Sequence, residues 1–388
     1  MPLGDLSPEA QLLLLASGGA GNDARIRELV TGGIDWEKLG WLAMRERAAP
    51  VLWDRLRSVP ALHIPDAAAP LRRVAMVSDF RMRHLEARLD DSLAALEDSR
   101  VDALLLKGAA LALTVYGSFT RRPMGDLDVL VRAPDVKRAL AALLGAGWSP
   151  VDASGLEEFY RGHQHLPALT DDRGTEVQLE LHTALFFEGH PFRLSPEDIW
   201  RRAKRIAVRG RSVYVPGTHD QLLHLCLHFA WSHLMSTGVW RTFRDLGALV
   251  ATGKIRWPEF TRLALESRGG SLCYWTFRLA RELAGVEVPA DVLSALRPPL
   301  PELVLSRVAR HFTYSLLPTE ALCPSVWVSH TLWRVGVRPG WSGHGGVRPW
   351  DRSDELLVPA ETRKSRSRRL ADQARNIKGW GKYVRAII

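Results

Sequence analysis

Apolar side chains recur every three or four positions through the first hundred residues, which is the spacing of one helical face. The clearest case is residues 66–99, where the repeating positions are Leu71, Val74, Val77, Leu85, Leu89, Leu93 and Leu96. The same spacing runs through residues 35–59, where Pro50 predicts a kink or a division of the helix. A helix-start signal, a serine followed by proline and an acid, stands at residues 7–9. This pattern predicts an N-terminal helical region over residues 1–99.

The pattern changes after residue 100, where short apolar runs and strict alternation replace the helical spacing. Residues 171–174 are typical of a turn that joins two strands. Mixed strands and helices of this kind predict a compact α/β core over residues 100–216. The predicted elements are strands at 101–106 and 126–131, a helix at 135–146, strands at 162–169 and 176–183, and one more strand at 205–215.

Helical spacing returns after residue 217 and predicts a C-terminal helical region over residues 217–317. Its clearest segments are 219–234, 240–251, 257–267 and 272–284. Residues 318–388 are rich in glycine, proline and tryptophan and end in a basic tail. The predicted fold class is therefore α+β, with a small mixed β-sheet core flanked by N-terminal and C-terminal helical segments.

The composition is that of a globular protein with one unusual end. Of the 388 residues, 46% are hydrophobic and 24% are charged, and the net charge is +9. Residues 362–388 hold nine lysines and arginines against one aspartate, so nearly the whole positive excess lies in this tail. The tail fits a solvated end, an RNA-binding segment that stacks Trp380 and Tyr383 on bases, or an amphipathic helix on an anionic membrane surface.

Cysteine usage and terminal composition indicate the compartment. Cys226, Cys273 and Cys323 lie far apart and show no zinc-binding spacing, which favours a reducing environment. The N-terminus lacks the charged and apolar regions of a signal peptide. No apolar run approaches the length that spans a bilayer. We therefore expect a cytoplasmic protein without a transmembrane segment.

Three carboxylates in the predicted sheet could do chemistry together. Asp126 and Asp128 stand two positions apart on one predicted strand, so their side chains share a face. Glu180 lies on the polar face of a later alternating strand. Carboxylate oxygens are the ligands that Mg²⁺ (or Mn²⁺) prefers. The pattern predicts that these three residues are metal ligands and catalytic residues of a two-metal phosphoryl-transfer site.

Histidines are expected beside this site. A four-residue turn before the Glu180 strand would set Glu180 opposite His165 and His182 opposite His163. His182 also shares the polar face of its strand with Glu180. We therefore expect His165 and His182 behind the metal ligands or on the side of the acceptor substrate, although they also fit sheet-surface residues that bond to neighbouring carboxylates.

The turn after the first predicted strand could hold a nucleotide. Lys107 and Gly108 stand between a strand and a helix, and backbone N–H groups at a helix start can cradle a phosphate. Gly108 and Ala109 would supply such groups, while Lys107 and Arg122 would supply positive charge. Without catalysis, Lys107 fits an exposed residue at a strand end, and Arg122 fits a structural salt bridge to Asp126.

The helical region after residue 217 carries two further candidates. His224 and His228 have the i, i+4 spacing of a zinc helix, but the leucines around them favour a buried, packed pair. Asp245 fits a helix cap or a partner of Arg241 or Arg244. We interpret all three as structural.

The stretches Lys107-Gly108-Ala-Ala-Leu111, Tyr116, Arg122-x-Met124-x-Asp126-x-Asp128-x-Leu130-Val131, Glu180-Leu-His182, Leu222-Leu-His224-Leu-Cys-Leu-His228 and Arg241-x-x-x-Asp245-Leu form a recognisable set. Over roughly residues 35 to 250 the chain resembles an uncharacterised bacterial nucleotidyltransferase family of the DNA polymerase beta-like nucleotidyltransferase superfamily. That superfamily usually has Gly-Gly or Gly-Ser at the nucleotide turn, where this chain has Lys107-Gly108.

The resemblance implies that Asp126 and Asp128 are metal ligands and that Glu180 is the third carboxylate. It also implies transfer of a nucleoside monophosphate from an NTP, expected to be ATP, to a hydroxyl or phosphate of a small molecule, a peptide or a protein. Two alternatives stay open: an RNA-directed transferase that uses the basic tail, and a catalytically silent binding module.

Overall fold

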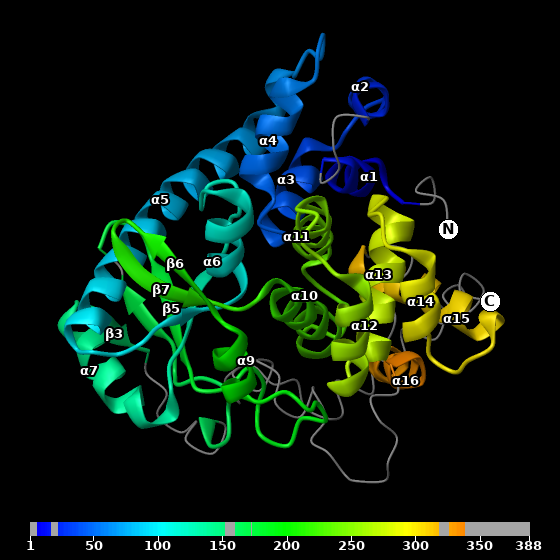
Figure 1. Cartoon of the computed structure of the whole chain (residues 1–388). Coiled ribbons are helices and arrows are strands. Elements are labelled where there is room, and N and C mark those ends of the chain that lie inside the picture. The colour runs from blue at the N-terminus through cyan, green and yellow to red at the C-terminus, as the bar shows by residue number, and fades with distance from the viewer. Residues whose placement is uncertain (1–5, 17–21, 152–159, 172, 318–325, 338–388) are drawn as a thin grey trace, which may run out of the picture.

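The computed structural model describes residues 6–16, 22–151, 160–171, 173–317 and 326–337. Nearly all of the segment predicted over 318–388, including its basic tail, lies outside the described residues. Within them, a seven-stranded sheet occupies one side of the molecule and packed helices occupy the other (Figure 1). This is the predicted α+β class with helical flanks.

The helices predicted at the N-terminus are confirmed. The Ser7 side chain accepts a hydrogen bond from the backbone N–H of Ala10 (3.3 Å), so the helix-start signal acts as expected. Pro50 stands in a first helical turn, where proline is tolerated, and the chain divides just before it. The helices are α1 (Pro8–Leu15), α2 (Asp23–Thr31), α3 (Trp36–Arg45), α4 (Ala49–Ser58) and α5 (Ala69–Asp98).

The sheet has the order β3-β4-β5-β2-β1-β7-β6 and is mixed. Its two central strands, β2 and β5, run parallel, whereas β2 and β1 run antiparallel. The strands are β1 (Leu104–Leu105), β2 (Asp126–Leu130), β3 (Ser149–Pro150), β4 (Leu169–Asp171), β5 (Val177–His182), β6 (Lys204–Val208) and β7 (Arg211–Val215). The helices among them are α6 (Lys107–Leu111), its π-helical continuation η4 (Ala112–Tyr116), α7 (Val136–Gly145) and α9 (Pro196–Arg202).

Alternation along β2 fixes which face of the sheet is apolar. Leu127 and Val129 are fully buried in a cluster with Leu85 and Leu89 of α5 and Leu143 of α7. These two helices therefore cover one face of the sheet. The opposite face carries the polar residues of β2 and β5, and it turns toward the C-terminal helices.

The strand predicted over 205–215 is wrong, because the chain reverses in its middle. Arg209 and Gly210 both have positive φ values, 47° and 84°, and β6 and β7 form an antiparallel hairpin around them. The sequence lacks the Asn-Gly or Asp-Gly signal that usually marks such a turn.

The predicted pairing of the histidine strand is also wrong. Only Leu169 of the strand predicted over 162–169 lies in β4, and the loop to β5 spans residues 172–176 instead of 171–174. His165 lies opposite His182, in an isolated bridge, and not opposite Glu180. The longer loop shifts the β4–β5 register, which alone would set His182 opposite Leu166, and a slip of one residue between His165 and Leu169 then brings His165 opposite His182.

The predicted C-terminal helices are present, and further helices extend the region. They are α10 (Thr218–Leu227), its π-helical continuation η6 (His228–Ser232), α11 (Val239–Ala251), α12 (Trp257–Glu266), α13 (Gly270–Ala284), α14 (Ala290–Leu296), α15 (Glu302–Leu316) and α16 (Val326–Val337). Trp240 of α11 is fully buried among the N-terminal helices, so the two helical regions pack against each other. Among the described helices, none has both the length and the apolar content of a membrane span.

The hairpin turn yields a stability prediction. Gly210→Val forces a β-branched residue into the left-handed region, so we expect the free energy of unfolding to fall by about 1–2 kcal/mol. Urea unfolding followed by circular dichroism measures it. Ala207→Val, at an exposed position of the same hairpin, is the matched control and should change stability by less than about 0.5 kcal/mol. Equal stability of both variants would contradict the turn geometry.

Candidate active site

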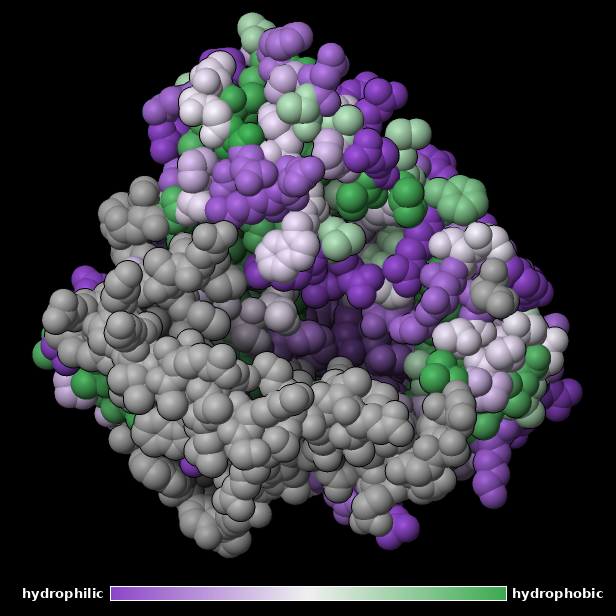
Figure 2. All heavy atoms as spheres, turned by 180° about the vertical axis from the view of Figure 1, so that it is seen from behind, coloured by the Kyte–Doolittle hydropathy of each residue, from purple (hydrophilic) through white to green (hydrophobic). Residues whose placement is uncertain are grey.

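The three predicted carboxylates lie on neighbouring strands of the polar sheet face. The parallel pairing of β2 with β5 sets Asp128 beside Glu180 and Asp126 beside Gln178. A cavity of about 280 Å³ opens over this face, and Asp126, Asp128 and Glu180 all line it. The back of the molecule has a hollow with hydrophilic walls (Figure 2). The sheet thus brings the predicted catalytic residues together as expected.

Asp128 is the most strongly compensated of the three. Its Oδ1 lies 2.7 Å from the Lys107 ammonium and 2.9 Å from Nε2 of His182. Burial opposes the charge of this carboxylate, but Lys107 and His182 outweigh that effect and hold the pKa of Asp128 well below its usual range. Burial likewise opposes the charge of Lys107, and Asp128 and Glu180 raise its pKa above the usual value. Asp128 and Lys107 are therefore both charged at neutral pH.

The surroundings of Asp126, in contrast, disfavour its ionised form. Burial, together with repulsion from Asp128 and Glu180, raises the pKa of Asp126. Among the described residues, no side chain donates a hydrogen bond to it. A half-buried carboxylate in this state gains from a bound cation.

The donor set suits a divalent cation. The Asp126 oxygens, Oδ2 of Asp128 and Oε1 of Glu180 make no hydrogen bond to the described residues. Asp128, Glu180 and His182 also bring one ligand atom each within 4.8 Å of one another. Asp126 stands outside that tight group, two positions back along β2. Hard oxygens on three side chains fit Mg²⁺ or Mn²⁺, and the imidazole would suit Mn²⁺ or a softer ion.

The chain matches a known protein family. A family model described as an uncharacterised nucleotidyltransferase matches residues 32–285. The chain belongs to this nucleotidyltransferase family. No curated protein and no solved structure matches it. The matched span contains every predicted site residue, and at this general level the protein is a transferase.

Of the four predicted nucleotide-binding residues of this nucleotidyltransferase, Lys107, Gly108 and Arg122 line the cavity and Ala109 does not. Lys107 begins α6 with a positive φ of 46°, and its ammonium forms an ion pair with Asp128. Gly108 allows a close approach, since a Cβ there would lie 3.1 Å from Cβ of Met124. Ala109 is buried under the turn. Whether they bind a nucleotide stays a prediction.

Arg122 is held inside the protein by Asp245. Its Nε and Nη2 donate to both carboxylate oxygens of Asp245 at 2.7–2.9 Å, and Tyr116 donates a further hydrogen bond to Asp245. The salt bridge considered between Arg122 and Asp126 is therefore replaced by a bidentate pair with α11. Asp245 binds Arg122 and Tyr116, and neither Arg241 nor Arg244, the partners considered for it, makes an ion pair with it.

Histidines border the carboxylates on one side. His165 lies with Nε2 at 3.5 Å from Oε2 of Glu180, and its ring packs 5.0 Å from that of His182. Burial lowers the pKa of His165, so it is neutral at pH 7. His182 differs, because its hydrogen bonds to Asp128 and Glu180 outweigh burial and raise its pKa. His165 and His182 thus lie next to the predicted metal ligands.

A second group of histidines lines the far wall of the cavity. His224, His228 and His233 lie on α10 and the turn that follows it, with ring centroids of successive residues 6.0 and 4.5 Å apart. Burial lowers the pKa of all three, to about 3 for His224 and His233. The lowered pKa values keep all three imidazoles neutral at pH 7, and the structural role interpreted for His224 and His228 stays a prediction.

Sequence reasoning missed two arginines of the cavity wall, Arg47 and Arg241. Arg47 lies between α3 and α4, and Arg241 lies on α11. Arg241 falls within a stretch of the family resemblance, whereas Arg47 follows a helix end without any motif. Charged residues on helices carry no periodic signal that separates a site from a solvated surface.

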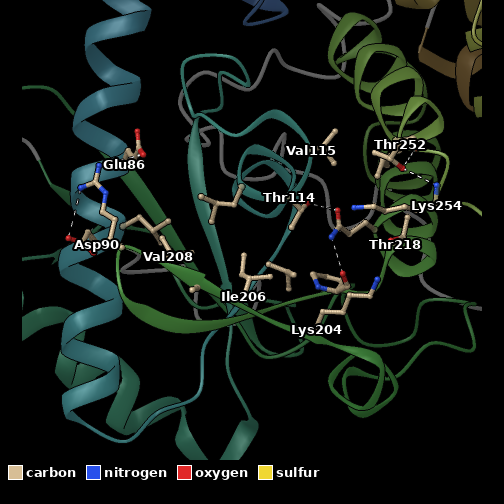
Figure 3. A pocket seen from close by; sticks show the side chains of 18 residues that line it. Glu86, Asp90, Thr114, Val115, Lys204, Ile206, Val208, Thr218, Thr252 and Lys254 are labelled. Carbon is tan, nitrogen blue, oxygen red and sulfur yellow. Dashed lines mark hydrogen bonds and ion pairs between the residues drawn. The ribbon is translucent and has the colours of Figure 1, made fainter.

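A larger cavity of about 440 Å³ lies on the other side of Gln221, which lines both cavities. Its acids Glu86 and Asp90 lie at one end, and Lys204 and Lys254 lie at the other (Figure 3). None of the three carboxylates lines it. The smaller cavity is therefore the candidate active site.

The pair of Arg122 and Asp245 yields a stability prediction. Asp245→Ala leaves a buried guanidinium without its partner, so we expect a loss of about 3–5 kcal/mol in the free energy of unfolding. Chemical unfolding measures it, and the double variant Arg122→Met with Asp245→Leu should recover most of the loss. Glu259→Ala, which breaks an exposed pair with Arg256, should cost under about 1 kcal/mol. A single variant as stable as the wild type would refute the role of this pair.

Proposed function

We propose that this family member is a divalent-metal-dependent nucleotidyltransferase. It moves a nucleoside monophosphate from an NTP, with ATP as the expected donor, to a hydroxyl or phosphate acceptor, and pyrophosphate leaves. The observation that carries the proposal is one cavity in which three carboxylates on neighbouring strands keep free oxygens beside a buried ammonium. This combination suits metal-assisted phosphoryl transfer.

Asp126, Asp128 and Glu180 would hold Mg²⁺ (or Mn²⁺). Bound there, the metal would neutralise the polyphosphate and activate the acceptor oxygen. Lys107 keeps Asp128 ionised and limits repulsion among the carboxylates. His182 orients Asp128 and Glu180 through Nε2, while its Nδ1 faces the carbonyl of Ala184 at 3.3 Å.

Gly108 and Ala109 are proposed as phosphate ligands through their backbone N–H groups, since the first residues of a helix have no intrahelical acceptor. Lys107 and Arg122 are proposed to act on the nucleotide by charge alone, because Asp128 and Asp245 already bind their side chains. His165 faces the carboxylates from the opposite side and is proposed to border the acceptor.

The acceptor is proposed to be a small molecule, a peptide or a protein side chain, and the location is proposed to be the cytoplasm. The alternative of an RNA acceptor depends on the tail at 362–388, which lies outside the described residues. Salt-dependent retention of RNA by the full chain, lost on deletion of the tail, would favour that alternative. The alternative of a silent binding module disagrees with the preserved carboxylates.

Labelled nucleotides test the proposed reaction. Incubation with Mg²⁺, cell extract and α-labelled NTP should label an acceptor, and chelation of the metal should abolish labelling. Asp128→Asn and Glu180→Gln each remove a charge at the reacting centre, so we expect about a 10²- to 10³-fold loss of rate.

Glu176→Gln, an exposed change beside β5, is the matched control and should keep the wild-type rate. Label from γ-labelled but not α-labelled ATP would indicate a kinase instead. Absence of Mg²⁺-dependent NTP binding in the wild type would exclude the enzyme and favour the binding module.

A further inference from the structure

We propose that Arg47 and Arg241 form a polyphosphate-binding subsite at the Asp126 end of the cavity, built from the two helical flanks. The subsite deepens the proposed function, because it would hold the phosphates of the donor nucleotide. The binding of an anion there does not itself depend on that function.

Neither guanidinium group has an acidic side chain within ion-pair distance among the described residues. Both line the cavity, and neither has an ion pair, a side-chain hydrogen bond or a ring contact with the described residues. The other arginines nearby are occupied: Arg122 by Asp245, and Arg244 by the carbonyl of Arg121 and the ring of Tyr116. Two unpaired guanidinium groups in one cavity are the arrangement that a multivalent anion would complete.

Burial and nearby positive charges make it unfavourable for Arg47 and Arg241 to remain without an anionic partner. Burial and repulsion from Arg122 and Arg47 lower the pKa of Arg241 to about 10, and attraction from Glu46 and Asp126 opposes that change. Burial also lowers the pKa of Arg47, and attraction from Asp126 opposes that change. Both arginines are still charged at neutral pH, and a phosphate chain beside them would relieve the repulsion.

The backbone holds Arg47 at this place at some cost. Arg47 has a φ of 55° and ends α3 in a left-handed turn, closed by bonds from its own N–H to the Met44 carbonyl and from the Ala48 N–H to the Ala43 carbonyl. Glycine is usual at that position of such a helix end. The left-handed backbone at Arg47 places its guanidinium against Gly125, the residue before Asp126.

Glu46, the residue before Arg47, links the end of α3 to the start of α11, where Arg241 lies. Its fully buried carboxylate accepts hydrogen bonds from the Arg45 side chain and from the backbone N–H of Trp240, at the start of α11. Arg241 is the next residue along α11. The end of α3 is therefore fixed against the first turn of α11, and Glu46 acts as a positioning residue for the subsite.

The chemical class of the ligand follows from the charges. Two guanidinium groups offer bidentate donors that match phosphate oxygens, and Asp126 beside them would share a metal with the same phosphates. A single phosphate would engage only part of this set. We therefore expect a preference for a chain of phosphates, as in inorganic tripolyphosphate or an NTP, over orthophosphate.

The test measures binding of inorganic tripolyphosphate to the full chain by calorimetry, with a chelator present so that the metal site plays no part. We expect wild type to bind, and Arg47→Gly and Arg241→Gln each to lose about ten- to a hundredfold in affinity. Arg47→Gly should also keep or raise the thermal midpoint, because glycine relieves the left-handed backbone. A folding defect would lower that midpoint instead.

Arg244→Gln is the matched control, since it removes the same charge from the same helix outside the cavity lining, and it should bind as wild type does. Tripolyphosphate that binds both arginine variants as tightly as wild type would overturn the subsite. Metal-free ATP should displace tripolyphosphate, and simultaneous binding of both would overturn its assignment to the donor.

The proposed function can fail separately. If no nucleotide is transferred but tripolyphosphate still distinguishes wild type from the two variants, the subsite stands alone. If transfer occurs and the KM for NTP is unchanged in both variants, the subsite falls and the transferase stands.

Discussion

The candidate active-site cavity depends on how the repulsion among three carboxylates is balanced. Parallel pairing of β2 and β5 places Asp128 and Glu180 side by side on strands about 4.8 Å apart, and Asp126 lies two positions earlier on the same face of β2. Lys107 and His182 both donate hydrogen bonds to Oδ1 of Asp128, so the compensating positive charge is concentrated at the Asp128 end of the cluster. The other end, at Asp126, keeps a raised pKa. This asymmetry points a cation toward Asp126 and leaves Asp128 as a fixed negative charge.

The helical flanks complete the cavity and hold it in place. Asp245 of α11 binds Arg122, which lies just before β2, and Glu46 binds the backbone of Trp240 at the start of the same helix. Trp240 itself is buried among the N-terminal helices. α11 thus joins the sheet to both flanks, and a displacement of this helix would disturb the three carboxylates and the arginines together.

Local periodicity was enough to predict part of this arrangement. The two-residue repeat places Asp126 and Asp128 on one face, and alternation places Glu180 and His182 on another strand of the same sheet. The register of His165 could not be obtained in this way, because it depends on the true length of the loop before β5 and on a one-residue slip between His165 and Leu169. The partner of Arg122 lies 123 residues away on another element, and no pattern in the sequence encodes that contact.

The turn at Lys107 and Gly108, which is proposed to bind the nucleotide, has a physical interpretation in this balance of charge. Lys107 has a backbone with positive φ, which favours glycine, and its ammonium reaches Asp128. Arg47, at the end of α3, likewise has a backbone conformation that favours glycine, and it also lines the cavity. Other non-glycine residues of this chain also have positive φ, so the backbone alone assigns nothing. What distinguishes these two is that each brings a positive charge to the carboxylate cluster, at Asp128 and Asp126 respectively.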